Sequence, residues 1–525
     1  MRCKYIIPLL LCLCGMATMV TAQNGFSKLY NYDRSNDWGN HVFVQPDSTY
    51  FVIGQDFVNS RSGLMNMQIS GDGSRYIARK EFLRLTDGKL YTGNTGRVKK
   101  TKQNRYLVPL VNVMPQANPN FGSYRLSGLA LLDSIGDTIK TQWYTDSTKY
   151  VEFVNDCLVL PDGGYLLGGE RGAAYINSND RKYNGLLYRT DSMGNLLWEK
   201  TYTKIGNTGI ASLDTTTDGN ILIGAHTIQL IDVGQGEHFI KNRPWFILAD
   251  ITNGSIIKDT FYHAGYAGGV GTGGGNIFSD KNGGYFHWGQ LDDMVEQPWY
   301  SYSNFSPYFA QLNQNFSVRK IKIFKPAIGG WHRYIWMVKQ TSDSGYILTG
   351  SAAEMYPDGG TPGWAAKLDK YGTVLWENTY SLDFRTTGYL VDAAETPDGG
   401  FIFTGSHSVA GSPTGQDMWL VKVDSNGCVV AGCTPTGITN TKIGHEDKTT
   451  IYPNPATDIL NVEMTSFPDE KEVKIELYDI AGRKVFQQLL TNNKTQIDIR
   501  HLQPGMYILK VSNSNNVEIH KVMKQ

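Results

Sequence analysis

Three short patterns in the sequence have residue types and spacings that could support chemistry. Gly269-x-Gly271-x-x-Gly274 has the letters of a dinucleotide-binding fingerprint, but that chemistry requires a strand before the turn and a helix after it. Residues 276–278 favour a strand instead, so we interpret the run as a loop. His445-Glu446 lacks the second histidine of a zinc protease. Asp292-Asp293 lies in a polar stretch that we interpret as a solvated loop, so no catalytic residue is identified.

An aromatic segment is the best candidate for a ligand surface. Residues 297–305 contain Trp299, Tyr300 and Tyr302, and Trp331 follows nearby. Exposed aromatic faces suit sugar rings or a partner protein. The alternative is that these rings cap or pack between structural units. We predict that these four side chains bind a glycan or a protein ligand, and we predict no cofactor and no metal site.

The first 22 residues have the features of a secretory signal peptide. Arg2 and Lys4 precede an apolar run over residues 6–20, and Val20-Thr21-Ala22 supplies small or apolar residues before a cut at Gln23. A lipoprotein is the alternative, because two cysteines lie in the run, but Leu13 is bulky where a lipobox has a small residue. No later segment approaches the length of a transmembrane helix.

Three cysteines remain after this leader. Cys428 and Cys433 are close in sequence, and in an oxidising compartment they are expected to form a local disulfide. Cys157 lies in an apolar stretch and is predicted to be a buried free thiol. Neither paired CxxC spacing nor paired histidines accompany these residues, which disfavours zinc.

Composition and charge narrow the class of protein further. The chain has 525 residues, 41% hydrophobic, with 57 glycines, which favours a folded, turn-rich protein of two or three domains. Its 49 basic residues balance 49 acidic residues. Without a basic excess, nucleic acid is not an expected partner.

A repeated unit organises most of the chain. It is clearest at residues 396–430, where Pro397-Asp398-Gly399-Gly400 leads into a short apolar strand that ends at Gly405. Copies recur at intervals of about 55–65 residues, each with room for four strands. Four antiparallel strands repeated radially predict an all-β propeller over residues 23–433, with seven blades and with six or eight as alternatives. Residues 23–32 resemble a lone fourth strand, so we expect them to complete the last blade and close the ring.

The repeat resembles secreted bacterial propellers with Asp-Gly-Gly turns and, more distantly, the pyrroloquinoline-quinone-type repeat. The chain departs from quinoprotein enzymes because it has no adjacent cysteine pair after the leader. It departs from the sialidase Asp-box because Asp191 and Gly194 are separated by two residues rather than one. The resemblance therefore implies the fold and not an activity.

A different module follows the propeller. Residues 434–449 are polar and are predicted to be a linker, and residues 450–525 contain short alternating strands typical of a small immunoglobulin-like sandwich. Residues throughout this module resemble the C-terminal sorting domain of cargo of the type IX secretion system. The matching positions are Tyr452, Pro453, Asn454, Pro455, Asp458, Gly482, Pro504, Gly505 and Tyr507.

The resemblance implies recognition by the type IX secretion machinery. It also implies secretion or display on the outer cell surface, with removal of the sorting domain by cleavage in the linker. We therefore expect an exported binding module for a glycan or a protein. The alternatives are a propeller enzyme acting on extracellular glycans and a structural surface protein.

Overall fold

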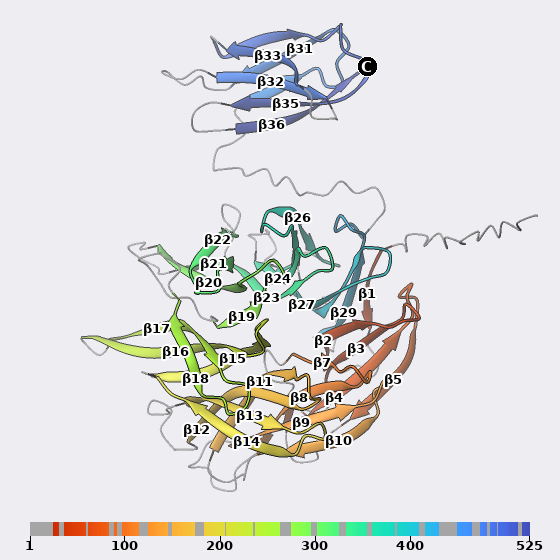
Figure 1. Cartoon of the computed structure of the whole chain (residues 1–525). Coiled ribbons are helices and arrows are strands. Elements are labelled where there is room, and N and C mark those ends of the chain that lie inside the picture. Colours follow the sequence, from red (N-terminus) through yellow and green to blue (C-terminus); the bar gives the residue numbers. More distant parts are fainter. Residues whose placement is uncertain are drawn as a thin grey trace, which may run out of the picture. The chain divides into compact units, whose positions relative to one another are not determined.

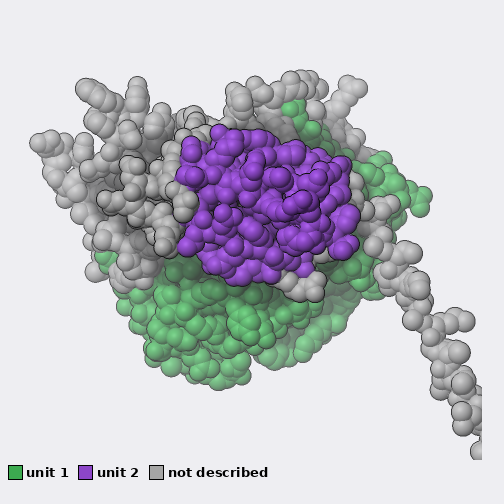
Figure 2. Space-filling view, turned by 90° about the horizontal axis from the view of Figure 1, so that it is seen from above, with its two compact units in different colours: residues 1–326, 330–435 green, residues 327–329, 436–525 purple. Residues whose placement is uncertain are grey.

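Every regular element described in the computed structural model is a β-strand. The model divides the chain into two units: residues 1–326 with 330–435, and residues 327–329 with 436–525. Figure 2 colours the two units separately. The structure describes residues 25–30, 36–58, 61–82, 89–91, 97–114, 124–144, 150–173, 183–204, 206–234, 237–262, 275–295, 302–324, 332–353, 360–383, 386–408, 415–429, 449–464, 473–479, 484–490, 492–512 and 517–525.

The described strands of the first unit form seven groups, called blades 1 to 7. Blades 1 to 3 comprise β2 (Asn36–Val44), β3 (Tyr50–Val58), β4 (Arg61–Ile69) and β5 (Tyr76–Phe82); β6 (Lys89–Tyr91), β7 (Lys99–Lys100), β8 (Tyr106–Met114), β9 (Tyr124–Leu132) and β10 (Thr138–Trp143); and β11 (Tyr150–Val159), β12 (Tyr165–Ala173), β13 (Tyr183–Thr190) and β14 (Leu196–Tyr202). Blades 4 and 5 comprise β15 (Asn207–Thr215), β16 (Ile221–Gly234), β17 (Glu237–Ala249) and β18 (Ile256–Phe261); and β19 (Asn276–Ser279), β20 (Tyr285–Val295), β21 (Tyr302–Leu312) and β22 (Val318–Ile323). Blades 6 and 7 comprise β23 (His332–Gln340), β24 (Tyr346–Ala353), β25 (Gly363–Leu368) and β26 (Val374–Tyr380); and β27 (Gly388–Glu395), β28 (Phe401–Ser408), β29 (Gln416–Val423) and β1 (Phe26–Tyr30).

The inner strands of the blades surround a common centre. Figure 1 shows β2, β7, β11, β15, β19, β23 and β27 near this centre, with the outer strands at the periphery. Antiparallel blades repeated around an axis define a β-propeller, which confirms the predicted fold and the seven-blade count. We call the end that carries the Asp-Gly-Gly turns the turn face, and the opposite end, where the inner strands begin, the loop face.

The N-terminal strand closes the ring, as the sequence predicts. β1 pairs antiparallel with β29, from Phe26 opposite Lys422 to Tyr30 opposite Met418. Blade 7 therefore takes three strands from the end of the propeller sequence and one from its beginning (Figure 1). This pairing covers an edge that would otherwise remain open to another chain.

The turn between the first two strands of each blade requires a positive φ at its central residue. This φ lies between 61° and 90° in all seven blades, and glycine tolerates such values without a steric penalty. The seven central residues are Ser48, Asn104, Gly163, Gly219, Gly283, Ser344 and Gly399. The preceding aspartate caps the turn, since the N–H of Gly400 donates to Asp398 Oδ1 at 3.1 Å. In blade 7 the fully buried Lys422 also pairs with Asp398, at 2.9 Å.

A β-bulge recurs in five inner strands and explains the glycine that follows the second-strand apolar run in four of these blades. The pairing register shifts in β2, β11, β15, β23 and β27. In blade 7 the shift leaves Val391 unpaired, and a Cβ built on Gly405 would lie 1.8 Å from the carbonyl oxygen of Tyr389. The same clash recurs at Gly54, Gly169 and Gly350, so the backbone of these four blades leaves no room for a side chain at this position. In blade 4 the equivalent residue is Ala225.

Side chains of the inner strands tie neighbouring blades to one another at several places. Asp156 Oδ2 accepts the N–H of Leu213 at 2.9 Å, which joins blade 3 to blade 4. Asp392 Oδ2 accepts the N–H of Val42 at 3.1 Å, which joins blade 7 to blade 1. Lys339 of blade 6 also pairs with Asp392, at 2.6 Å. The ring is therefore held by side-chain bonds as well as by β1.

Asp392 makes the stability of the ring dependent on pH. Burial alone would raise the pKa of Asp392, but Lys339 and His41 lower it from 3.8 to about 2. A carboxyl with a depressed pKa stabilises the fold above its unfolded pKa, and this contribution is lost as the pH falls from about 4 through about 2. We expect a loss of about 2 kcal/mol in the free energy of unfolding over this range. Urea denaturation at a series of pH values measures this change in the free energy of unfolding. If an Asp392→Asn variant showed the same pH dependence, the effect could not be assigned to Asp392.

The second unit consists of two facing sheets. One contains β30 (Thr449–Tyr452), β31 (Ile459–Met464) and β34 (Lys494–Asp498), and the other contains β32 (Val473–Asp479), β33 (Lys484–Leu490), β35 (Gly505–Ser512) and β36 (Val517–Lys524). Leu460, Ile475 and Leu509 come from both sheets and are fully buried in one core. The unit is therefore sandwich-like, while the immunoglobulin-like topology stays a prediction.

Several residues of the predicted sorting motif stabilise this sandwich. Asn454 Oδ1 accepts the N–H of Met523 at 2.9 Å, and the Tyr507 hydroxyl donates to the carbonyl of Gln503 at 2.9 Å. Gly482 lies outside the described residues, as do the predicted signal peptide and residues 430–448, which include most of the predicted linker.

Candidate functional site

The aromatic residues predicted to bind a ligand are mostly outside the described part of the chain. Trp299, Tyr300 and Trp331 belong to that remainder. Tyr302 begins β21, opposite Val295 at the end of β20, so Tyr302 lies at the loop-face end of blade 5. Its ligand-binding role stays a prediction.

The predictions for the acidic pair Asp292-Asp293 and for the cysteines can be compared with the structure. Asp292 and Asp293 belong to β20, where they pair with Phe305 and Asn304, so their assignment to a loop was wrong. The long hairpin β20–β21 extends regular pairing into this polar stretch.

Cys157 is a buried free thiol, as predicted. Cys428 is buried, but Cys433 is not described, so the disulfide stays a prediction.

Arg97 crosses the centre of the propeller. It lies just before β7, is 6% exposed, and donates to Asp156 Oδ2 of blade 3 and to Asn276 Oδ1 of blade 5, both at 2.8 Å. Its guanidinium also lies over the ring of Phe278, 4.5 Å from the centroid, and its Nε lies 3.4 Å from the sulfur of Met337 in blade 6. One side chain of blade 2 therefore contacts blades 3, 5 and 6 at the axis.

An aromatic collar lies on the loop-face side of Arg97. Four inner strands carry an aromatic residue two positions before the bulge: Trp38, Phe153, Tyr334 and Tyr389. We call these four residues the aromatic collar. The Arg97 partners Asp156 and Met337 directly follow their bulges, so the collar is nearer to the start of each inner strand.

The collar is partly exposed although the adjoining inner-strand positions are largely buried. Trp38 is 38% exposed, and Trp336, the unpaired bulge residue of β23, is 42% exposed. The ring of Trp336 lies 6.3 Å from that of Tyr334 and 6.4 Å from that of Tyr389. Burial raises the pKa of Tyr334 and of Tyr389, so both remain neutral phenols at physiological pH.

Each collar residue pairs with a polar residue of the second strand. Cross-strand partners point to the same face of a sheet, so polar groups accompany the aromatic rings. The partners of Trp38, Phe153, Tyr334 and Tyr389 are Gln55, Glu170, Ser351 and Ser406. Aromatic surface beside a few polar groups is the composition of small-molecule and sugar sites.

The sequence contains a signal for the collar, which lies in strands and not in the aromatic segment around Trp299. Trp38 precedes Gly54 by sixteen residues, and Tyr389 precedes Gly405 by the same interval. The interval is constant because the bulge sets both the position of the glycine and the register of the aromatic. An aromatic residue at this distance from the second-strand glycine would have identified the collar.

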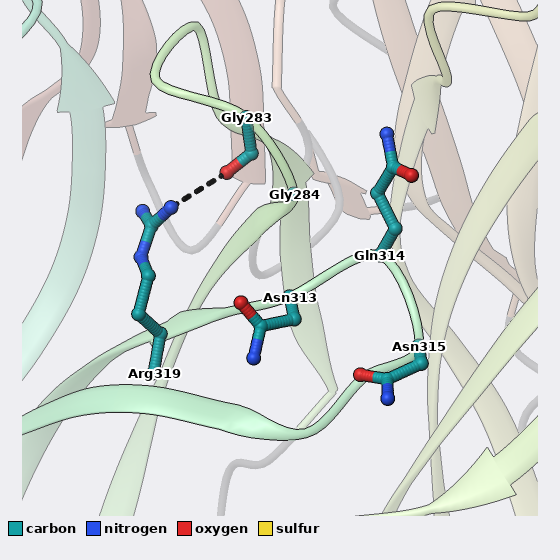
Figure 3. Close-up of a pocket in the computed structure, with 6 residues that line it drawn as sticks. All are labelled: Gly283, Gly284, Asn313, Gln314, Asn315 and Arg319. Carbon is teal, nitrogen blue, oxygen red and sulfur yellow. Dashed lines mark hydrogen bonds between the residues drawn. The ribbon is translucent and has the colours of Figure 1, made fainter.

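A shallow polar pocket on the turn face is a weaker candidate. It has a volume of about 510 Å³ and lies between the two turns of blade 5 (Figure 3). Its one charged residue, Arg319, already donates to the carbonyl of Gly283 at 3.1 Å and pairs with the buried Asp280 at 3.0 Å. The guanidinium is therefore engaged within blade 5.

Among the described residues, no group of three or more His, Cys, Asp or Glu side chains is arranged to hold a metal ion. None of the described segments is a helix with the length and apolarity needed to cross a membrane.

A family comparison identifies the second unit. Residues 450–525 match the family model of the secretion system C-terminal sorting domain. These are the residues for which the sequence predicts this domain. No curated protein matches the chain.

Solved structures similar to the chain are distant. BamB from Moraxella catarrhalis is 12% identical and covers 76% of this chain and 99% of its own, with a TM-score of 0.31. A polysaccharide lyase described as an ulvan lyase is 9% identical and covers 76% and 96%, with a TM-score of 0.42. A subtype N11 neuraminidase-like protein is 10% identical and covers 77% and 95%, with a TM-score of 0.34. Such scores carry no argument about activity, and the fold rests on the strand pairings above.

Proposed function

Because this chain is cargo of the type IX secretion system, exported to the cell surface or secreted, we propose that its propeller binds extracellular glycans at the aromatic collar. The observation that supports this most is the repetition of a partly exposed aromatic residue at one position of four inner strands. Sugar rings present apolar C–H faces that pack on aromatic rings, and their hydroxyls bond to neighbouring polar groups. Formal net charge is zero, so a neutral glycan fits better than a strongly charged polymer.

A glycan array with the purified chain tests the proposal. We expect Trp336→Ala and Tyr389→Ala each to weaken binding about tenfold or more, because each removes one ring from a stacking surface worth on the order of 1–2 kcal/mol per ring. Tyr371→Ala is the matched control, since Tyr371 is an exposed aromatic of the β25–β26 turn of blade 6, on the turn face. Trp336 is the bulge residue whose ring lies beside the collar residues Tyr334 and Tyr389. Binding that survives both Trp336→Ala and Tyr389→Ala would sink the proposal.

The same glycan array tests the aromatic residues Trp299 and Tyr300, which the sequence analysis predicts to bind a ligand. If Trp299 and Tyr300 extend the glycan site at the loop face, Trp299→Ala with Tyr300→Ala will weaken binding further. Full affinity in this double variant would limit the site to the collar.

A second candidate function is cleavage of an extracellular glycan. It is favoured by one carboxyl beside the collar, Glu170, whose pKa burial raises to about 7, since general acids have a raised pKa. Incubation of each bound glycan with the chain and mass analysis of products distinguishes the two functions. Unchanged glycans support binding alone.

A further inference from the structure

The aromatic collar has a gap in blade 4. The position two residues before the bulge of β15 is Gly209. A Cβ built on Gly209 would lie 2.8 Å from Glu170 Oε2 and 3.0 Å from His226 Nε2. Two polar side chains of neighbouring blades therefore converge on the space that a collar side chain occupies in blades 1, 3, 6 and 7.

The two side chains come from second strands. Glu170 is on β12 opposite the collar residue Phe153, and His226 is on β16 opposite Gly209. Burial raises the pKa of Glu170 to about 7, against the opposing effect of Arg125. Burial lowers the pKa of His226 to about 4. Near neutral pH the histidine is uncharged and the carboxyl titrates.

We propose that this gap is a polar subsite of the glycan site, where Glu170 and His226 bind sugar hydroxyls and where ionisation of Glu170 weakens binding. The inference rests on the proposed function of the collar. The ligand class is a neutral oligosaccharide, because its hydroxyls can donate to His226 and accept from the protonated carboxyl.

The direction of the pH effect follows from desolvation. A sugar that covers the gap removes the remaining water from Glu170, and this disfavours the charged carboxylate. Binding is then coupled to protonation, and the affinity falls as the pH rises above about 7. Arg125 on β9 and His226 are the charged or titratable groups described around Glu170, and the other facing residues are Phe153, Gly185 and Gly209.

Two substitutions separate the subsite from the collar. Glu170→Gln keeps hydrogen bonding but cannot ionise. Gly209→Ala fills the gap, and its new methyl group meets ends of side chains rather than backbone. Thermal unfolding of each variant confirms that it is folded, and Glu170→Gln tests the proposal even if Gly209→Ala does not fold.

The probes are neutral oligosaccharides of four to six glucose, galactose, mannose or xylose units, measured by calorimetry from pH 6 to pH 8 with the full chain. For a bound oligosaccharide we expect about tenfold weaker binding at pH 8 than at pH 6. Glu170→Gln should remove this dependence, and Gly209→Ala should weaken binding at every pH.

The outcomes distinguish the subsite from the collar. Binding that Trp336→Ala reduces, but that is unchanged in affinity and pH profile by Glu170→Gln and Gly209→Ala, overturns the subsite and leaves the glycan site standing. No binding to any probe, or binding that Trp336→Ala leaves intact, overturns both.

Discussion

Arg97→Ala is expected to lower the free energy of unfolding by about 3–5 kcal/mol, the range found when one partner of a buried ion pair is removed. The substitution leaves Asp156, which is fully buried, without its cation. It also removes the bond to Asn276, so blades 3 and 5 lose their connection across the axis. Urea denaturation followed by tryptophan fluorescence measures the change.

A double variant isolates the cause of this loss. Asp156→Asn removes the charge but keeps an oxygen for the N–H of Leu213. In Arg97→Met with Asp156→Asn no charge is left unpaired, so we expect more than half of the lost stability to return. A double variant no more stable than Arg97→Ala would show that shape at the axis, rather than charge, determines the stability.

The second large effect is expected at the glycine of the second strand. Gly405→Ala would place a methyl group 1.8 Å from the carbonyl oxygen of Tyr389. The clash is with backbone, so the two strands must move apart to relieve it. We expect about 3–5 kcal/mol of destabilisation, at the upper end for overpacking, measured as a lower midpoint in thermal unfolding.

Gly399→Asn is the matched control in the same hairpin. Gly399 has a φ of 79°, and a Cβ there would meet nothing within 4 Å. Asparagine tolerates positive φ, so the cost should stay below about 1 kcal/mol. Equal destabilisation in the two variants would contradict the role assigned to the bulge.

The repeat pattern was sufficient to predict the architecture. Turn residues such as Asp398 and Gly399, and the alternation of the strands that follow, are local features whose effect on the chain does not depend on distant contacts. The missing fourth strand of blade 7 likewise predicted the pairing of β1 with β29. The matches from Tyr452 to Tyr507 predicted the sorting domain that the family comparison identifies.

The candidate site was not predicted, because its residues are far apart in sequence and unremarkable one at a time. Trp38 and Tyr389 become members of one surface only when the ring closes. Arg97 lies in the weakest copy of the repeat, and its partners Asp156 and Asn276 follow it by more than fifty residues. Glu170 and His226 meet because Gly209 lacks a side chain between them.

The sequence by itself determined the blades, the closure of the ring and the export route, because periodic apolar runs, turn residues and a contiguous motif act locally. Only the tertiary structure decided where Arg97 lies, how exposed the collar residues are and which carboxyl is desolvated. The physical reason is that burial and side-chain proximity depend on how the blades pack against one another. A repeat pattern specifies the strands of each blade, but it does not specify which side chains of neighbouring blades meet at the axis.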